Sequence, residues 1–453
     1  NADDTLLVTS STDHTSCVWD SHTGAPVCPP MPHSYIVEAS FFIRDDGILT
    51  VSGDRMIRHW KLQNKSMVSM TQTPNGISNA LAVSQDGSLF ITGGTTGLVQ
   101  ITKTKTNTRQ GGLIDHGKEI TCIAMSPDND LIVVGDTSIA TSIYRLSRPG
   151  ERIQTSNNDA LFTMKAREKK PLLSVQFSPD GSRLLVVHDG NEASVYRTDT
   201  GVLLYNIRHS RSLLNAKFSQ DGTRILSASR DGTAILWDAQ TGDPTGIELV
   251  HKDYVDACAI SPDGKIIASG SRDHTAKILN VQTGEQIGPN LQHQGGIVSI
   301  TFAPDGKSVA TGSRDGVARI WRLNHLNMPL TMQAGLGRVF VKYSPDGNIL
   351  LTANEKQIRL WDTVDGKSLG TVLSHHSDID EFYVTPDSNL IIASTVDGNI
   401  KTWQMPSADM SPIHELEARV ELVTGYRADF RQGLKLLTPR QLRKRITQSV
   451  DTP

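Results

Sequence analysis

The stretch HQGGIVSITFAPDGKSVATGSRDGVARIWR, residues 293–322, decides the fold of this chain. Apolar side chains alternate with polar ones over 298–303, which is the two-residue period of a β-strand. The Pro-Asp-Gly triplet at 304–306 predicts a turn, because proline presets one backbone angle and glycine tolerates a positive φ. A second short strand leads to Asp-Gly at 315–316, a hairpin signal before a third strand. The stretch is therefore predicted to be a three-stranded meander.

Four side chains of this stretch are spaced so that they can form one hydrogen-bonded chain. Asp315 would accept a hydrogen bond from His293, and the Thr311 hydroxyl would lie between the imidazole and the ring N–H of Trp321. Such a chain satisfies polar groups that would otherwise be buried without partners. The alternative is a catalytic His–Asp pair, which needs an activated nucleophile and an oxyanion site. Neither is evident in the sequence, so the structural interpretation is favoured.

The unit recurs along most of the chain. Positions equivalent to Trp321 follow one another at intervals of 40 to 42 residues, except for one interval of 52 residues before Tyr196. This period, with the strand alternation, is typical of four-stranded propeller blades. The unit resembles a WD40 repeat, and the resemblance covers residues 1 to about 404. The ten equivalent positions are Trp19, Trp60, Thr102, Tyr144, Tyr196, Trp237, Leu279, Trp321, Trp361 and Trp403.

Three repeats carry the complete set of four side chains, which resembles the structural tetrad of WD40 repeats. Elsewhere the set is incomplete: Leu279 replaces the indole after His251, and Thr102 replaces it in the third repeat. Loss of a buried indole predicts a looser blade. The complete sets are His33, Thr50, Asp54 and Trp60; His209, Ser227, Asp231 and Trp237; and His293, Thr311, Asp315 and Trp321.

The resemblance implies an all-β fold, a WD40 β-propeller of four-stranded antiparallel blades. A propeller closes by pairing its first and last blades, and WD40 domains usually close with seven. Counting back from Trp403, seven repeats reach Tyr144, with an outer strand expected within 104–114. Residues 104–404 are therefore expected to form a seven-bladed ring, and residues 1–103 the last blades of a truncated preceding propeller. A single ring of ten blades is less favoured, because typical propellers have four to eight.

The periodicity changes after the last repeat. Apolar residues at helical spacing begin at Ile413, and Gly425 is placed to end that helix. Thr438 and Pro439 predict the start of a second, basic helix. Residues 405–453 are therefore expected to be a short helical, partly basic tail. This tail resembles those that follow WD40 arrays in large bacterial proteins, some of which carry a serine/threonine kinase domain upstream.

Composition narrows the classes of function. The 453 residues carry a net charge of −3, which gives no overall attraction to nucleic acid or membrane. Four cysteines are too few for a disulfide framework in a chain of this length, and no CxxC metal spacing occurs. Neither a cofactor nor a metal is therefore expected. The first residues align inside a repeat and lack a methionine, so the sequence is interpreted as a fragment whose compartment stays open, with the cytoplasm favoured.

One connection is locally basic. Residues 145–170 contain the extra residues of the fifth repeat and carry seven basic against three acidic side chains. A basic loop can contact an acidic partner or nucleic acid, but Phe162 is the only aromatic residue available to stack on bases. A solvated connection is therefore favoured, and no nucleic-acid partner is expected.

Three arginines stand apart from the repeat framework. Arg230, Arg272 and Arg314 occupy the same place in three consecutive repeats, directly before the turn aspartate. In WD40 domains this position resembles a site on the top face where partners often contact the ring. Three guanidiniums along an arc could hold carboxylates or phosphorylated groups bidentately. The alternative is that each arginine pairs with a nearby acid or with solvent, and the sequence does not decide between the two.

The sequence contains no enzyme motif of the GxxxxGK[ST], GxSxG, HExxH or kinase type. The favoured function is a non-catalytic scaffold that binds a protein or peptide segment, expected to be acidic, on the top face, with no membrane partner. The alternative is the sensory or regulatory arm of a larger enzyme, such as a bacterial serine/threonine protein kinase, with its catalytic domain upstream. A propeller hydrolase or lyase is less favoured, because it would need titratable residues in the central channel that the repeats do not explain.

Overall fold

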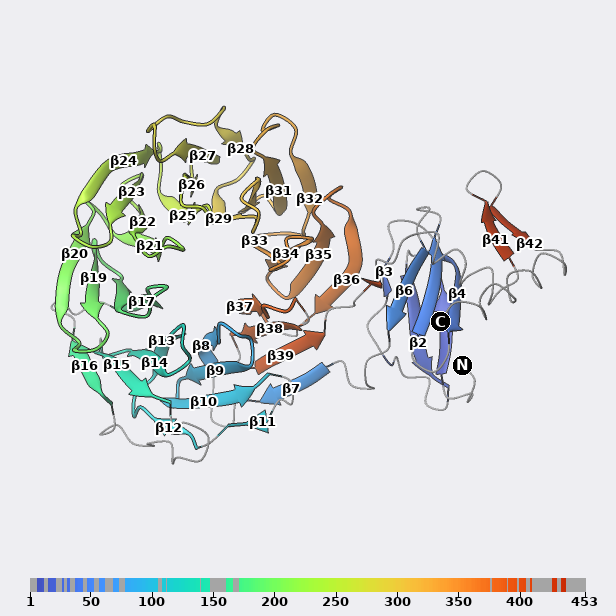
Figure 1. Cartoon of the computed structure of the whole chain (residues 1–453), viewed down its shortest axis with the longest axis horizontal. Helices are drawn as coiled ribbons and strands as arrows, with labels where there is room; N and C mark the ends of the chain where they lie inside the picture. Colours follow the sequence, from blue (N-terminus) through green and yellow to red (C-terminus); the bar gives the residue numbers. More distant parts are fainter. Residues whose placement is uncertain are drawn as a thin grey trace, which may run out of the picture. The chain divides into compact units, whose positions relative to one another are not determined.

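The computed structural model shows a chain in which every regular element of the described residues is a β-strand (Figure 1). The structure describes residues 171–374 without interruption. The other described stretches are 6–11, 15–21, 27, 31–32, 37–43, 47–52, 57–61, 68–72, 78–104, 108–110, 112–138, 140–146 and 160–165 before it, and 377–388, 390–396, 399–404, 408–409, 426–429 and 433–436 after it.

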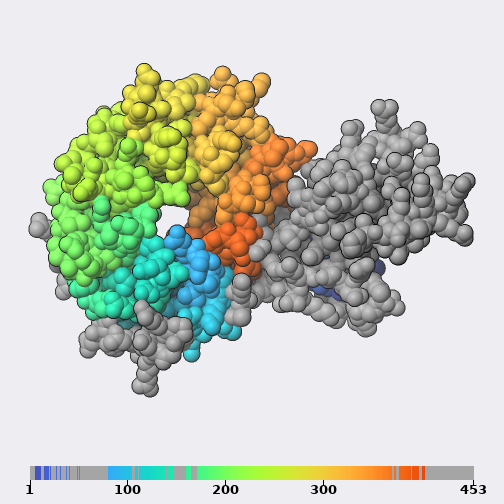
Figure 2. Space-filling view, in the orientation of Figure 1, coloured from blue at the N-terminus to red at the C-terminus, as the bar shows by residue number. Residues whose placement is uncertain are grey.

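The chain divides into two compact units. The larger unit, residues 69–367 and 372–403, is a closed ring of eight antiparallel sheets around a central opening (Figures 1 and 2). Each sheet is one blade. Its first strand lies at the opening, and the following strands lie progressively farther out (Figure 1). The ring is therefore an all-β, eight-bladed propeller.

The strands follow the chain order within each of the first seven blades. These blades are β8 (Ser78–Val83), β9 (Leu89–Gly94) and β10 (Leu98–Lys103) with the short β11 (Thr108–Arg109) and β12 (Ile114–Asp115); β13 (Ile120–Met125), β14 (Leu131–Asp136), β15 (Ala140–Arg145) and β16 (Phe162–Lys165); β17 (Leu172–Phe177), β18 (Arg183–His188), β19 (Glu192–Arg197) and β20 (Leu203–Arg208); β21 (Leu213–Phe218), β22 (Arg224–Ser229), β23 (Thr233–Asp238) and β24 (Pro244–Val250); β25 (Val255–Ile260), β26 (Ile266–Ser271), β27 (Thr275–Asn280) and β28 (Leu291–Gln292); β29 (Ile297–Phe302), β30 (Ser308–Ser313), β31 (Val317–Arg322) and β32 (Leu330–Gln333); and β33 (Phe340–Tyr343), β34 (Ile349–Asn354), β35 (Gln357–Asp362) and β36 (Ser368–Ser374).

The blade β29–β32 confirms the meander predicted for residues 293–322. Thr311 in β30 pairs with Ile300 on one side and with Arg319 on the other. Gly306 has a φ of 69° in the first turn and Gly316 a φ of 83° in the second, so both turns use the left-handed conformation that glycine adopts without strain. A side chain at 316 would also meet the backbone of the next loop.

The core lies between neighbouring blades. A middle strand is buried on both faces because each blade packs against two others. In β30, for example, the adjacent residues Val309 and Ala310 point to opposite faces and both are fully buried. This explains why the middle strands are apolar over consecutive residues, while the inner and outer strands alternate more strongly.

The eighth blade takes its outer strand from much earlier in the chain. It contains β37 (Ile379–Val384), β38 (Leu390–Thr395) and β39 (Asn399–Gln404), and β7 (Val68–Gln72) pairs beside β39. Apolar side chains join this blade to the first one: Leu81 and Phe90 pack with Ile392 and Ile400. The ring is thus closed by a strand that precedes its first blade in sequence.

The expectation of a seven-bladed ring over 104–404 is wrong. Residues 78–103, expected in a preceding propeller, form the first blade of this ring, and the stretch 104–114 adds β11 and the start of β12 to that blade instead of closing the ring. The third repeat has Thr102 in place of the indole, but a blade needs only paired, apolar strands. In this blade, Phe90 of β9 and Ile101 of β10 are buried and provide the apolar packing.

The smaller unit comprises residues 1–68, 368–371 and 404–453. It contains the sheet β1 (Leu6–Ser10), β2 (Thr15–Asp20) and β3 (Met31–Pro32), and the sheet β4 (Val37–Ile43), β5 (Gly47–Ser52), β6 (Ile57–Lys61) and β40 (Ala408–Asp409). The second sheet has the strand order of a blade. That residues 1–68 belong to a preceding propeller stays a prediction.

The tail also contains strands. β41 (Tyr426–Asp429) and β42 (Gly433–Leu436) form an antiparallel hairpin. The two helices expected from Ile413 and from Thr438 lie outside the described residues. Within 405–453, the described part of the chain is therefore β-structure only.

Candidate partner-binding face of the ring

The three arginines lie in the turns between the second and third strands of three consecutive blades. A buried serine precedes each arginine and fixes its turn. In the middle turn, the Ser271 hydroxyl accepts the N–H of Asp273 at 3.1 Å and donates to the carbonyl of Asp253 at 3.0 Å. The turn is thereby attached to the loop before β25. Ser229 and Ser313 make equivalent bonds in the other two blades.

A continuous chain of contacts joins the three arginines. Arg272 donates from Nε to both carboxylate oxygens of Asp256, at 3.0 and 2.9 Å, and Arg314 donates to the same carboxylate at 3.3 Å. The guanidinium carbons of Arg272 and Arg230 lie 5.0 and 6.0 Å from the centroid of the Tyr254 ring. We call Arg230, Tyr254, Arg272, Asp256 and Arg314 the arginine arc.

The arc carries more positive than negative charge. Arg272 and Arg314 share the carboxylate of Asp256, so one negative charge partly neutralises two guanidiniums. The hydrogen bond that Arg272 donates to Asp256 raises the pKa of Arg272, which stays charged. Arg230 is exposed and makes no ion pair within the described residues. The Nε of Arg314 is buried and has no hydrogen-bond partner there. The arc, with three guanidiniums and one carboxylate, is therefore the candidate site for an anionic partner.

The four residues expected around His209 come together behind this face. Its Nδ1 lies 3.0 Å from Asp231, its Nε2 lies 2.7 Å from the Ser227 hydroxyl, and Trp237 donates from Nε1 to the same hydroxyl at 2.7 Å. Burial lowers the pKa of His209. Burial acts to raise the pKa of Asp231, but hydrogen bonds from Thr233 and the nearby histidine outweigh it and hold the value at about 2. A neutral imidazole thus donates to an ionised carboxylate.

The set around His293 has a fifth member that the sequence interpretation missed. Nε2 lies 2.7 Å from the Thr311 hydroxyl, which also accepts from Trp321 at 2.8 Å. Arg319 donates to Nδ1 at 2.5 Å and lies 3.5 Å from Asp315. Since arginine only donates, Nδ1 has no proton and Nε2–H donates to Thr311. Burial, with the Arg319 charge, lowers the pKa of His293 to about 4.

The blade between these two keeps the set without the indole. His251 lies 3.1 Å from Asp273 through Nδ1 and 2.8 Å from the Ser269 hydroxyl through Nε2. Leu279 is buried where the other blades have tryptophan. The imidazole and carboxylate therefore assemble without the indole, which adds packing and one hydrogen bond.

The blade β13–β16 builds a different version of this network. His116 uses Nε2 to contact Asp136 at 2.9 Å and Nδ1 to contact the Tyr144 hydroxyl at 2.6 Å, so its ring is reversed. Asp136 ends β14, two positions earlier than the aspartates of the complete sets, so the spacing of those sets does not point to it. A buried acid after the apolar run LIVVG was the available signal.

The first expected set cannot be assembled from the described residues. His33 and Asp54 lie outside them, and Trp60 lies in β6 with its side chain outside them. Thr50 is fully buried in β5. This set stays a prediction. In the sheet β1–β3, Trp19 donates to the Thr9 hydroxyl at 2.9 Å, which is the corresponding indole bond.

Titratable side chains of the inner strands β33 and β37 lie between two neighbouring blades, and the repeat pattern gives no sign of them. Lys342 donates to the Phe382 carbonyl at 2.6 Å, and its Nζ lies 3.9 Å from the Tyr383 ring centroid. Burial lowers the pKa of Lys342 to about 8. Burial raises the pKa of Glu381 to about 6 against the attraction of Lys342. These groups join two blades, but among the described residues no nucleophile pairs with them.

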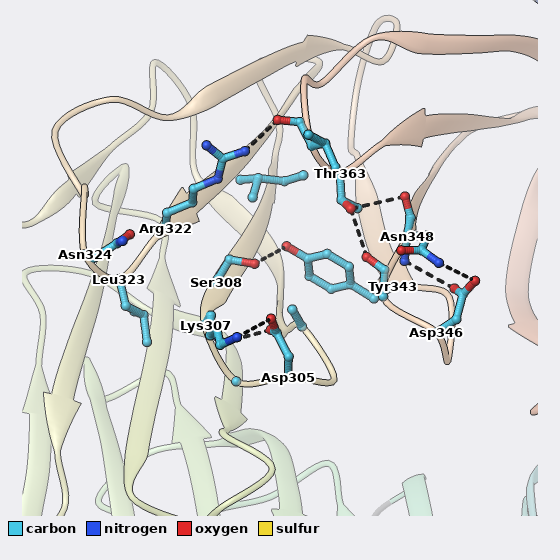
Figure 3. A pocket seen from close by; sticks show the side chains of 15 residues that line it. Asp305, Lys307, Ser308, Arg322, Leu323, Asn324, Tyr343, Asp346, Asn348 and Thr363 are labelled. Carbon is cyan, nitrogen blue, oxygen red and sulfur yellow. Dashed lines mark hydrogen bonds and ion pairs between the residues drawn. The ribbon is translucent and has the colours of Figure 1, made fainter. Parts of the chain in front are cut away.

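The opposite face of the ring has a cavity of about 640 Å³ between the blades β29–β32 and β33–β36 (Figure 3). It lies at the Ser308 end of β30, whereas Arg314 follows the other end. Seven blades have leucine, isoleucine or arginine at the position of Ser308, so the small serine leaves space. Its hydroxyl lies 3.0 Å from that of Tyr343. Figure 3 shows these two side chains pointing toward each other.

The described residues offer little else for chemistry. They contain no group of three or more His, Cys, Asp and Glu side chains that could hold a metal ion. Burial raises the pKa of Cys122 to about 12 and that of Cys258 to about 11, so both thiols stay protonated. In the described part of the chain, no helix has the length and apolar character to cross a bilayer.

Comparison with known proteins identifies two matching families. The family described as WD domain, G-beta repeat, matches residues 107–140, 201–238 and 244–280, and the family described as Nucleolar protein 10-like, N-terminal domain, matches residues 263–414. Apoptotic protease-activating factor 1 of Homo sapiens is 25% identical over 394 residues, which cover 84% of this chain and 30% of that protein. The U3 small nucleolar RNA-associated protein 15 homolog of Xenopus laevis is 28% identical over 148 residues, covering 32% and 28%. The chain thus spans about a third or less of these relatives.

Solved structures share the ring. Sqt1 of Chaetomium thermophilum, bound to the N-terminus of the ribosomal protein L10, matches with a TM-score of 0.65 and 16% identity, covering 74% of this chain and 98% of that chain. The computationally designed Ika8 protein matches with a TM-score of 0.62 and 20% identity, covering 75% and 98%. At these identities the likeness shows the fold alone. The repeats, the ring and the family matches agree: this chain carries WD40 repeats, and they build an eight-bladed β-propeller.

Proposed function

We propose that this chain is a non-catalytic scaffold that binds an acidic protein or peptide segment along the arginine arc. WD40 propellers typically mediate protein interactions. The observation that carries the proposal is the continuous contact of three arginines through Tyr254 and Asp256, with Arg230 exposed and without an ion pair in the described residues. Excess guanidinium charge on a rigid turn favours bidentate binding of carboxylates.

The other observations support a protein partner. The Sqt1 structure that shares the fold holds the N-terminus of a ribosomal protein, so a ring of this kind can take a peptide segment. The net charge of −3 does not favour nucleic acid. His209 and His251 hydrogen-bond Asp231 and Asp273 behind the face, so these side chains brace the turns instead of contacting a substrate.

The test is to replace Arg230, Arg272 and Arg314 together by glutamate and to compare the proteins captured from a native lysate by quantitative mass spectrometry. The matched control replaces Arg197, Lys265 and Lys367 by glutamate. This control changes the net charge by the same amount as the arginine variant. Its three positions are exposed and lie at the ends of strands opposite to those that carry the arginine arc.

The arginine variant is expected to lose partners that both the unchanged chain and the control retain. Capture of the same partners by all three proteins would refute the proposal. Thermal unfolding of each protein shows whether the ring stays folded, so that lost binding is not confused with lost structure.

A further inference from the structure

An apolar loop lies beside the arginine arc. Leu336, in the loop between β32 and β33, is 86% exposed, and Phe340 at the end of that loop is 40% exposed. The loop is attached to both flanks of the Arg314 turn. Ala334 donates to the Gly316 carbonyl at 3.0 Å, and Val339 donates to the Ser313 carbonyl at 3.1 Å. The two apolar side chains are thereby held next to the last arginine of the arc.

The backbone of this loop holds Leu336 outward. Gly335 and Gly337 flank it with φ values of 131° and 83°, which other residues rarely adopt. The Leu336 carbonyl accepts a hydrogen bond from Asn354 at 3.3 Å. The equivalent loops of the three preceding blades read SRS, KDY and QGG and contain no aliphatic residue. An aliphatic side chain in water on a fixed backbone is free to cover apolar surface of a partner.

Asp256 already occupies the position that a ligand carboxylate would take. It accepts from Arg272 through two oxygens and from Arg314 through one, and its side chain is only 11% exposed. A carboxylate from a partner would therefore bind Arg230 first and would compete with Asp256 for the other two guanidiniums. The internal aspartate weakens binding and shows that the site accepts a carboxylate.

We propose that the arc and the loop together bind a peptide segment in which carboxylates alternate with aliphatic residues. The carboxylates bind Arg230 and its neighbours, and an aliphatic side chain covers Leu336 and Phe340. This inference rests on the proposed function and adds the apolar half of the ligand. Alternation suits an extended segment, because successive side chains then face opposite sides and the strand can present both kinds to adjacent parts of the face.

The experiment measures the affinity of the full chain for three fluorescent peptides by anisotropy. One peptide alternates Asp with Leu, one alternates Asp with Ser, and one alternates Lys with Leu. The Asp-Leu peptide is expected to bind most tightly and the Lys-Leu peptide not to bind. Arg230→Glu should weaken both acidic peptides by roughly tenfold or more, because an attractive charge becomes repulsive.

Two further variants separate the charged from the apolar contribution. Leu336→Ser should remove most of the advantage of Asp-Leu over Asp-Ser, roughly fivefold to tenfold, and leave Asp-Ser binding unchanged. Met328→Ser is the control, because Met328 is 81% exposed and lies in the β31–β32 connection at the other face. Asp256→Asn should strengthen both acidic peptides by roughly two- to fivefold, since it releases guanidinium charge. A gain in affinity cannot come from a misfolded ring.

The outcomes distinguish the two proposals. Equal binding of Asp-Leu and Asp-Ser, both weakened by Arg230→Glu, overturns the apolar half and leaves the acidic site intact. Equal binding of Lys-Leu and Asp-Leu, or binding of the acidic peptides that is indifferent to Arg230→Glu, overturns the proposed function as well. Weaker binding in Asp256→Asn would show that this aspartate belongs to the ligand site and would overturn its assigned role as a competitor.

Discussion

At the scale of single residues, the blades are braced by imidazoles that stay neutral beside ionised carboxylates. A neutral His209 satisfies Asp231 and Ser227 at the same time, and burial makes the protonated form unfavourable. His209 and His293 are in different tautomers, because Arg319 donates a hydrogen bond to Nδ1 of His293. The polar network stabilises the turns that carry the arginines. Replacing one buried histidine should therefore lower the stability of its blade.

Replacing His293 by Ala should lower the free energy of unfolding by roughly 1 to 3 kcal/mol, because Thr311 and Arg319 each lose a buried hydrogen-bond partner. Urea unfolding at neutral pH measures the change. His325→Ala is the matched control, since His325 is exposed and its imidazole makes no hydrogen bond within the described residues. Unfolding curves that coincide with that of the unchanged chain would argue against the network.

Stability should also fall with acidification. The pKa of His293 is about 4 in the folded chain and 6.5 as a free side chain. The unfolded chain therefore takes up the proton first as the pH drops, so the contribution of this histidine is complete above pH 6.5 and is lost toward pH 4. Glu381, with its pKa raised to about 6, acts in the opposite direction over the same range.

Comparison with the His293→Ala chain isolates the histidine, because Glu381 is present in both proteins. The unchanged chain should lose on the order of 2 to 3 kcal/mol more than the variant between pH 7 and pH 4, measured by urea unfolding. Parallel pH profiles would show that His293 does not titrate with folding. The aspartates extend the acid loss, since Asp231 and Asp273 have pKa values of about 2 against an ordinary 3.8.

At the scale of the element, the repeat could be predicted from sequence because its causes are local. Alternating apolar residues, the Pro-Asp-Gly turn and the Arg-Asp-Gly hairpin around Thr311 determine three strands without help from other blades. Arg319 and Asp136 escaped prediction because their roles depend on how strands place side chains in space. The inner-strand charges of Lys342 and Glu381 escaped for the same reason: they approach each other only once two blades stand side by side.

At the scale of the whole molecule, the ring closes by a contact between segments that are distant in sequence. No local pattern marks Val68–Gln72 as the outer strand of the last blade, because any short alternating strand fits that edge. Counting repeats with the usual seven therefore gave the wrong closure. The eighth blade leaves no unpaired edge at β39, because β7 pairs there.

Hydrogen–deuterium exchange of Asn399–Gln404 tests this closure most directly. Proline at both Ser69 and Met70 removes two adjacent N–H groups of β7, and one of them must face β39, because successive N–H groups of a strand point to opposite sides. The amides of β39 should lose protection in this variant and keep it in the matched Thr108→Pro chain, which changes β11 only. The eight-bladed ring would be contradicted if β39 kept its protection in the double-proline variant and lost it in the Thr108→Pro chain.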